Sequence, residues 1–128
     1  FVNLQYGECA AEIAAAEAKF NVRIYQDPDI DPLDDLDGFA AQVAAMDAVL
    51  STSNTTVHMA GALGTPVWCV LPPAGQSIWY WFLERGDSPW YGSLRLVRQS
   101  PGEPWRETIG RAARMVRLSD GMAWPGAQ

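Results

Sequence analysis

Small hydroxyl residues and the only histidine of this chain lie close together in the sequence. Ser51, Thr52 and Ser53 follow a short apolar run, and His58 comes about one helical turn after them. Hydroxyl donors, the free backbone N–H groups of a helix N-terminus and the positive end of the helix dipole together favour an anion, by roughly 0.3 to 2 kcal/mol for the dipole. The residue types and their spacing therefore predict a site for a phosphate group.

The role of His58 has two interpretations. Helical side chains lean back toward the helix N-terminus, so its ring could reach the same anion as the hydroxyl groups. In the other interpretation His58 is a half-buried residue whose ring nitrogens bond only within the protein. The residues alone leave both open.

The elements that would position these groups are two buried strands and a helix. Apolar runs over Ala48 to Leu50 and Val67 to Leu71 predict strands buried on both faces. Between them, Asn54 is a natural N-cap for a helix over Thr55 to Leu63, and Gly64 is a natural C′ residue. Two such strands so close together imply a parallel βαβ crossover. The phosphate site would lie beyond the carboxyl end of the first strand.

The rest of the chain alternates strands and helices in the same way. Further helices are expected over Glu8 to Phe20, Leu36 to Met46 and Trp105 to Leu118, and further strands over Phe1 to Gln5, Val22 to Tyr25 and Leu94 to Arg98. This alternation predicts the α/β class, with a Rossmann-like parallel sheet and helices on both faces. With 128 residues, of which 48% are hydrophobic, the chain is expected to form one domain over residues 1–118 and a tail over 119–128.

Charge and cysteine content limit the partners and the compartment. The net charge is −6, and Lys19 is the only lysine, which argues against a nucleic-acid or anionic-membrane surface. No apolar run approaches the ~20 residues of a membrane span. Cys9 and Cys69 lack metal or CxxC spacing, as is typical of reduced thiols in a cytoplasmic protein.

Two other residue groups suggest chemistry. Six aspartates crowd one loop, but Pro32 and Gly38 stand where an EF-hand would need Gly and Glu, so we expect a solvated acidic loop and no metal. Asp35 would cap the next helix. The aromatic run from Trp79 to Phe82 could form a stacking platform for a base, but we favour a short helix that buries two or three rings.

The stretch STSNTTVHMAGALGTPVW resembles the donor-site segment of the heptosyltransferase-like glycosyltransferases (glycosyltransferase family nine), in a bacterial branch whose glycosyltransferase region follows tetratricopeptide repeats. The family motif runs roughly S-x-D-T-x-x-x-H-x-A-x-A-L-G-x-P, and this chain matches at Ser51 or Ser53, Thr55, His58, Ala60, Ala62, Leu63, Gly64 and Pro66. A second segment, Ser88 to Gln99, is very similar to SPWY-x-S-x-RL-x-RQ of that branch. The chain departs from the family at Asn54, where an aspartate associated with the donor sugar is usual.

The resemblance implies the C-terminal half of a GT-B fold, the lobe that binds the nucleotide-sugar donor. The diphosphate of an ADP- or UDP-linked sugar would lie at the turn from Ser51 to Thr56, and no other cofactor is implied. The binding residues would be Ser53, Asn54, Thr55, Thr56, His58, Gln5 and Gly7. No residue of this chain is assigned a catalytic part.

The resemblance also implies partners and an activity. The acceptor lobe and the tetratricopeptide repeats would lie upstream in the same chain. The full-length protein would transfer a hexose or heptose, and this part alone would bind the donor without turnover. The alternative is a non-catalytic interaction module that kept the fold of such a lobe, which the Asn54 departure favours. A receiver domain and a nicotinamide-binding domain are excluded, because the chain lacks the aspartate and lysine of the first and the GxGxxG turn of the second.

Overall fold

The computed structural model describes residues 1–119. The described residues form two compact units, one over Phe1–Gln42 and one that begins at Val43, and each is treated by itself. Whether they act as the single domain expected over residues 1–118 stays a prediction. Ser119, expected to begin a tail, is the last residue of a helix, and the rest of that tail lies outside the described residues.

The second unit is built on a parallel sheet of three strands. In chain order it contains β1 (Val49–Thr52), α3 (Thr55–Leu63), β2 (Val67–Leu71), the short 3-10 helix η1 (Trp79–Trp81), β3 (Leu94–Arg98) and α4 (Trp105–Ser119). The sheet order is β1-β2-β3, with Val49 beside Val67 and Val67 beside Leu94. The expected βαβ unit is confirmed, and the bounds of α3, β2 and β3 agree with the prediction.

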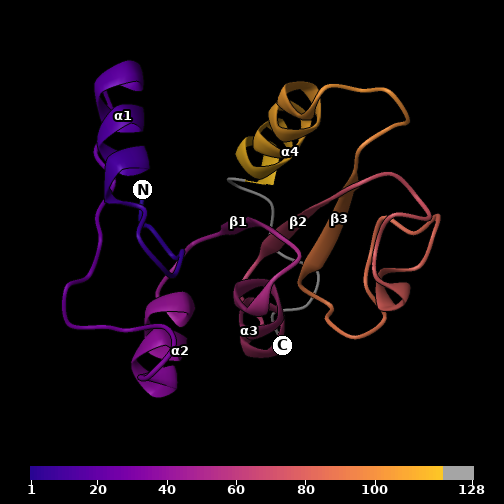
Figure 1. Ribbon diagram of the computed structural model, residues 1–128. Helices are drawn as coiled ribbons and strands as arrows, with labels where there is room; N and C mark the ends of the chain where they lie inside the picture. The colour runs from indigo at the N-terminus through magenta and orange to yellow at the C-terminus, as the bar shows by residue number, and fades with distance from the viewer. Residues whose placement is uncertain (120–128) are drawn as a thin grey trace. The chain divides into compact units, whose positions relative to one another are not determined.

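Different helices cover the two faces of the sheet, α4 on one and α3 on the other (Figure 1). On one face, Trp68 and Val70 of β2 and Val97 of β3 pack with Ala112 of α4. Because side chains alternate along a strand, Cys69 and its odd-numbered neighbours in β2 point to the other face, where α3 lies against β1 and β2. All five residues of β2 are buried, as the continuous apolar run predicts for a central parallel strand.

The buried side of α4 differs from the expected one. The helical spacing of the apolar residues predicts that Trp105 and Ile109 face the core together with Ala112. They are 44% and 49% exposed, while Thr108 and Ala112 are fully buried. Thr108 can be buried because its hydroxyl donates to a carboxylate oxygen of Glu103, 3.0 Å away, which satisfies its polar group. The spacing of apolar residues along the helix could not predict that the polar Thr108 is buried.

The first unit contains α1 (Ala10–Phe20) and α2 (Leu36–Ala44), and α2 runs across the boundary between the units. Helical spacing predicts that Leu36, Phe39, Val43 and Met46 are buried; Phe39 and Val43 are, but Leu36 is 55% exposed. Asp35 caps α2 through a 2.8 Å bond from the Gly38 N–H, which confirms its expected part. The helix ends two residues earlier than predicted, before Met46.

The two strands expected in this unit are not formed as strands. The segments Phe1 to Gln5 and Val22 to Tyr25 meet in one isolated parallel bridge, between Val2 and Tyr25. Its bonds run from the Tyr25 N–H to the Phe1 carbonyl and from the Asn3 N–H to the Tyr25 carbonyl. One bridge gives too few ladder bonds to make a regular sheet. The chain is therefore of the α/β class with a three-stranded parallel sheet, and half of a GT-B fold is not shown.

Glu103, in the loop between β3 and α4, supplies a test of this part of the fold. Its carboxylate accepts bonds from Arg111, from the Ser100 N–H at 2.8 Å and from Thr108, and Arg111 also donates to the Arg98 carbonyl. The hydrogen bond from Arg111 is the largest cause that lowers the pKa of Glu103 from 4.5 to about 2. The loop and the helix are thus joined through one ionised side chain.

An acid whose pKa is lower in the folded state than in the unfolded state stabilises the folded state. This contribution is fully present when the pH is above the unfolded-state pKa, and it is lost as the pH falls toward the folded-state pKa. We therefore expect Glu103→Gln to be less stable than wild type above pH of about 4.5, with a difference that shrinks as pH falls toward about 2. Urea unfolding across this range measures it, with Glu84→Gln, at an exposed loop position, as control. A difference that stays constant with pH would contradict the ionised network.

Candidate functional site

The predicted phosphate turn lies at the carboxyl end of β1 and leads directly into α3. Asn54 is the N-cap, with extended backbone angles, and its Oδ1 accepts a bond from the Val57 N–H at 3.3 Å. Its Nδ2 donates to the Ser51 Oγ at 3.0 Å, which closes the turn from the other side. At the far end of α3, Gly64 has φ +78° and its N–H bonds back to α3 carbonyls. Both predicted helix ends are confirmed.

The turn presents some of its donors to solvent and covers others. Thr52 and Thr55 are exposed, while Thr56 is only 4% exposed. The Ser53 hydroxyl accepts a 2.8 Å bond from the Trp81 Nε1–H, so an indole ring from η1 covers it. The first N–H groups of a helix have no intrahelical partner. Because the Asn54 cap takes the Val57 N–H, the remaining donors of the turn are the Thr55 hydroxyl and the N–H groups of Thr55 and Thr56.

His58 lies inside a cluster of three aromatic side chains. Its Nδ1 is 3.0 Å from the Tyr91 hydroxyl, and its Nε2 is 3.4 Å from the Tyr80 hydroxyl. The ring stacks on Trp81, with centroids 5.2 Å apart and planes 16° from parallel. Burial lowers the pKa of His58 below 6.5, so the neutral ring predominates at pH 7. One ring nitrogen then donates a hydrogen bond and the other accepts one.

Tyr91 reaches His58 because α3 has a glycine where the tyrosine ring lies. A Cβ added at Gly61 would be 2.5 Å from Tyr91 Cγ and 2.9 Å from Tyr91 Cβ, closer than atoms can approach. The ring therefore packs directly on the helix backbone. This packing fixes the Tyr91 ring. Of the two tyrosine bonds to His58, the one from Tyr80 is the longer.

Arg98 adds a positive charge at the same edge of the sheet. It is the last residue of β3 and lies beside Leu71, the last residue of β2. Its guanidinium donates to the carbonyls of Trp81 and Phe82 and to the Ser77 hydroxyl, at 2.6 to 2.9 Å. Because these bonds hold the η1 segment, Arg98 fixes the position of the aromatic residues around His58.

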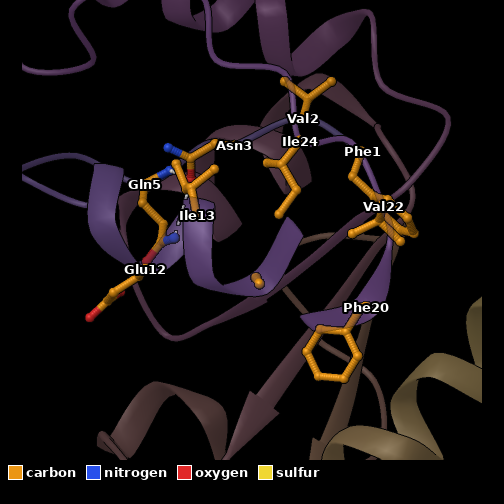
Figure 2. A pocket seen from close by; sticks show the side chains of 10 residues that line it. Phe1, Val2, Asn3, Gln5, Glu12, Ile13, Phe20, Val22 and Ile24 are labelled. Carbon is orange, nitrogen blue, oxygen red and sulfur yellow. Dashed lines mark hydrogen bonds between the residues drawn. The ribbon is translucent and has the colours of Figure 1, made fainter. Parts of the chain in front are cut away.

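The two remaining predicted site residues, Gln5 and Gly7, belong to the first unit, and their part in a phosphate site stays a prediction. Gln5 lines a groove of about 530 Å³ between α1 and the N-terminal segment (Figure 2). Its side chain donates to the Asn3 Oδ1 at 3.2 Å. The groove is mainly apolar, and its lining includes one carboxylate, from Glu12, and no Lys or Arg. Such a lining does not favour an anion.

The structure places Asn54, Thr55 and Thr56 at the N-terminus of α3, Ser53 against Trp81, and His58 one turn further along the helix. Their binding of a phosphate group stays a prediction. The sequence did not identify Tyr80, Trp81 and Tyr91 as the side chains that hold His58. Only Trp81 of η1 is fully buried, so the expected burial of two or three rings there is wrong. Two small residues pair with large rings: Gly61 with Tyr91 and Ser53 with Trp81. No local sequence pattern predicts these pairs, because the partners are far apart in the chain.

The acidic and cysteine side chains of the described residues do not form a metal site. Within residues 1–119, no group of three His, Cys, Asp or Glu side chains is placed to hold a metal ion. Cys9 and Cys69 are free and buried, and burial raises the pKa of the Cys69 thiol to about 12. No helix in this part of the chain is long and apolar enough to cross a membrane.

Asn54→Ala is expected to lower the free energy of unfolding by about 0.5 to 2 kcal/mol, because it removes the cap of α3. Thermal or urea unfolding measures this change. A variant as stable as wild type would show that the Ser51 and Val57 bonds contribute nothing to the turn.

Comparison with known proteins gives one relative for most of this chain. The chain is 43% identical over 117 residues to Protein FlbA of Caulobacter vibrioides, a match that covers 91% of this chain and 19% of FlbA. The chain thus spans about a fifth of the length of that relative. No family model matches the chain, and no solved structure matches it.

These findings contradict the assignment to the heptosyltransferase-like glycosyltransferases, and we withdraw it. No model of that family matches, and the relative that does match has a different name, which supports neither a glycosyltransferase nor a tetratricopeptide-repeat protein. Several of the residues that suggested the assignment have a general structural reason. A capping turn, a helix closed by Gly64 and a proline before a buried strand are needed by many βαβ units.

Proposed function

We propose that the turn from Ser51 to Thr56 binds the diphosphate group of a nucleotide or nucleotide-sugar. The observation that carries this proposal is the ordered N-terminus of α3 at the carboxyl edge of a parallel sheet, with Thr55 open to solvent. Ligands of open α/β sheets bind beyond this edge, and helix N-termini favour phosphate groups. Arg98 adds a positive charge at this edge of the sheet, in a chain whose net charge is −6.

His58 would contribute one hydrogen bond to the ligand. If the Tyr91 hydroxyl donates to Nδ1, the proton lies on Nε2, which points to Tyr80. A phosphate oxygen would then replace the Tyr80 hydroxyl at the longer of the two bonds. Tyr91 sets the tautomer in this arrangement, since its ring is held against Gly61.

The expected transfer of a hexose or heptose concerns a protein longer than this chain. Sugar transfer would need an acceptor site, and none of the described residues is assigned to one. Transfer from a nucleotide-sugar stays a prediction about the full-length protein, and so does a cytoplasmic location. For this chain by itself we propose ligand binding without turnover.

A non-catalytic interaction module is the second candidate, and a specific observation favours it. Side chains at the turn already have partners within the chain: Asn54 bonds Val57 and Ser51, Ser53 bonds Trp81, and His58 bonds two tyrosines. Such a turn is stable without a ligand. In this candidate the turn only caps α3.

Calorimetric titration with ADP, UDP and GDP distinguishes the two candidates. Because Thr55 at the turn is open to solvent, we expect weak binding, with Kd on the order of 10 μM to 1 mM, or about −4 to −7 kcal/mol. Thr55→Pro is the sharpest variant, because proline is well tolerated at the first position of a helix but lacks the N–H donor. The extended backbone of Asn54 also suits a residue before proline.

Thr55→Ala is the matched control, since it removes the hydroxyl and keeps the N–H. We expect Thr55→Pro to weaken diphosphate binding by about 10-fold to 100-fold, in line with a lost hydrogen bond to a charged group, and Thr55→Ala to weaken it less. Absence of binding by wild type to all three nucleotides at millimolar concentration would favour the interaction module. Equal affinities of wild type and Thr55→Pro would place the ligand elsewhere.

A further inference from the structure

The η1 segment exposes a large aromatic surface beside the His58 cluster. Trp79 is 76% exposed, although it lies two residues from Trp81, which is fully buried. With this exposure, at least one face of the Trp79 indole is open to solvent. A large apolar side chain gains stability when it is covered, so the exposed Trp79 indole offers a face on which a flat ligand can stack.

Ring contacts connect Trp79 to the proposed diphosphate site. The Trp79 and Tyr80 rings pack edge to face, with centroids 5.7 Å apart, and the Tyr80 ring is 5.4 Å from His58. Two successive ring contacts thus separate the Trp79 indole from a side chain on α3. On the other side of the cluster, Trp81 bonds Ser53 of the turn itself. The η1 segment that carries Trp79 therefore contacts the turn through Trp81.

The backbone that carries Trp79 is held at several points. Arg98 donates to the carbonyls of Trp81 and Phe82, and the Trp90 Nε1–H donates to the Tyr80 carbonyl at 3.1 Å. The Trp81 N–H bonds the Ile78 carbonyl, which closes the turn. A surface held in this way loses little conformational entropy when a ligand covers it.

We propose that the Trp79 indole stacks on the base of the nucleotide whose diphosphate lies at the α3 N-terminus. This inference rests on the proposed function and names the part of the ligand that gives added affinity. Every nucleobase has a flat π face, so stacking on Trp79 would favour nucleotides over inorganic diphosphate without selecting one base. Trp90 is less suited, because its ring stacks on Phe82 and its N–H is bonded within the chain.

Titrations with ADP and with inorganic diphosphate test the inference, because only ADP has a base. We expect Trp79→Ala to weaken ADP binding about tenfold, within the range for loss of a base–aromatic stack, and to leave binding of inorganic diphosphate unchanged. Trp79→Phe should keep most of the affinity for ADP, since it retains an aromatic face. Trp105→Ala, at an exposed tryptophan on α4, is the matched control and should bind both ligands as wild type does.

The outcomes separate the two proposals. If wild type and Trp79→Ala bind ADP equally, or if wild type binds ADP no better than inorganic diphosphate, the stacking inference is overturned and the diphosphate site stands. If wild type binds neither ligand, both proposals fall. A loss of inorganic diphosphate affinity in Trp79→Ala would also contradict stacking, because Trp79 would then act on the phosphate site.

Discussion

Trp81→Ala is expected to lower the free energy of unfolding by about 3 to 5 kcal/mol, the usual cost of removing a large buried aromatic side chain. Trp81 is fully buried, stacks on His58 and donates its indole N–H to Ser53. The substitution removes apolar contacts and also leaves the Ser53 hydroxyl without that donor. Small domains have total stabilities of about 5 to 15 kcal/mol, so this loss is large.

Urea unfolding of three variants separates the contributions of Trp81. Trp81→Phe keeps a ring against His58 and loses the bond to Ser53, so we expect a smaller loss than for alanine. Trp79→Ala, at an exposed neighbouring position, is expected to change the unfolding free energy by less than about 0.5 kcal/mol. Similar losses for Trp79→Ala and Trp81→Ala would contradict the arrangement in which only Trp81 faces the core.

Gly61→Ala is expected to destabilise the chain, although alanine is the better helix former. Alanine in place of a helical glycine contributes up to about 1 kcal/mol. Here the new Cβ would meet Tyr91 at 2.5 Å, near the base of its side chain, so the Tyr91 backbone must move as well. Overpacking of this kind costs about 1 to 3 kcal/mol, so we expect a net loss.

Gly110→Ala in α4 is a close control for this change. A Cβ there meets only the Arg114 Nη1, at 3.6 Å, which is an ordinary contact, so we expect this variant to be slightly stabilised. In Gly61→Ala the His58 ring should also become more exposed, and its pKa, which burial lowers, should rise toward 6.5 in an NMR titration. Equal stabilisation of both variants would show that Tyr91 does not pack on the backbone of α3.

The sequence was most informative where a local signal fixed each end of an element. Asn54 and Gly64 mark α3 by capping chemistry, and the apolar run of β2 marks a strand buried on both faces. Prediction was weaker where burial depends on distant partners. The extended segments around Val2 and Tyr25 form one bridge instead of strands.

The candidate site shows the same division between local and distant information. The turn residues could be found from the sequence, because a helix N-cap and its neighbours are adjacent in the chain. The environment of His58 could not, since Tyr80 and Tyr91 are 22 and 33 residues away from it. Spacing alone could not show that Gly61 leaves room for Tyr91. Short motifs also suggested a family that the comparisons contradict, because capping residues recur in unrelated βαβ units.

The most direct test of the central claim is an NMR titration of the backbone amides with ADP. We predict that the largest shifts will occur at Thr55 and Thr56, whose N–H groups begin α3, with smaller shifts at His58. The same titration with adenosine, which lacks phosphate, should leave the Thr55 and Thr56 amides nearly unchanged. Saturable shifts at these two amides with ADP would support the diphosphate site. Shifts that leave Thr55 and Thr56 unaffected at millimolar ADP would contradict it.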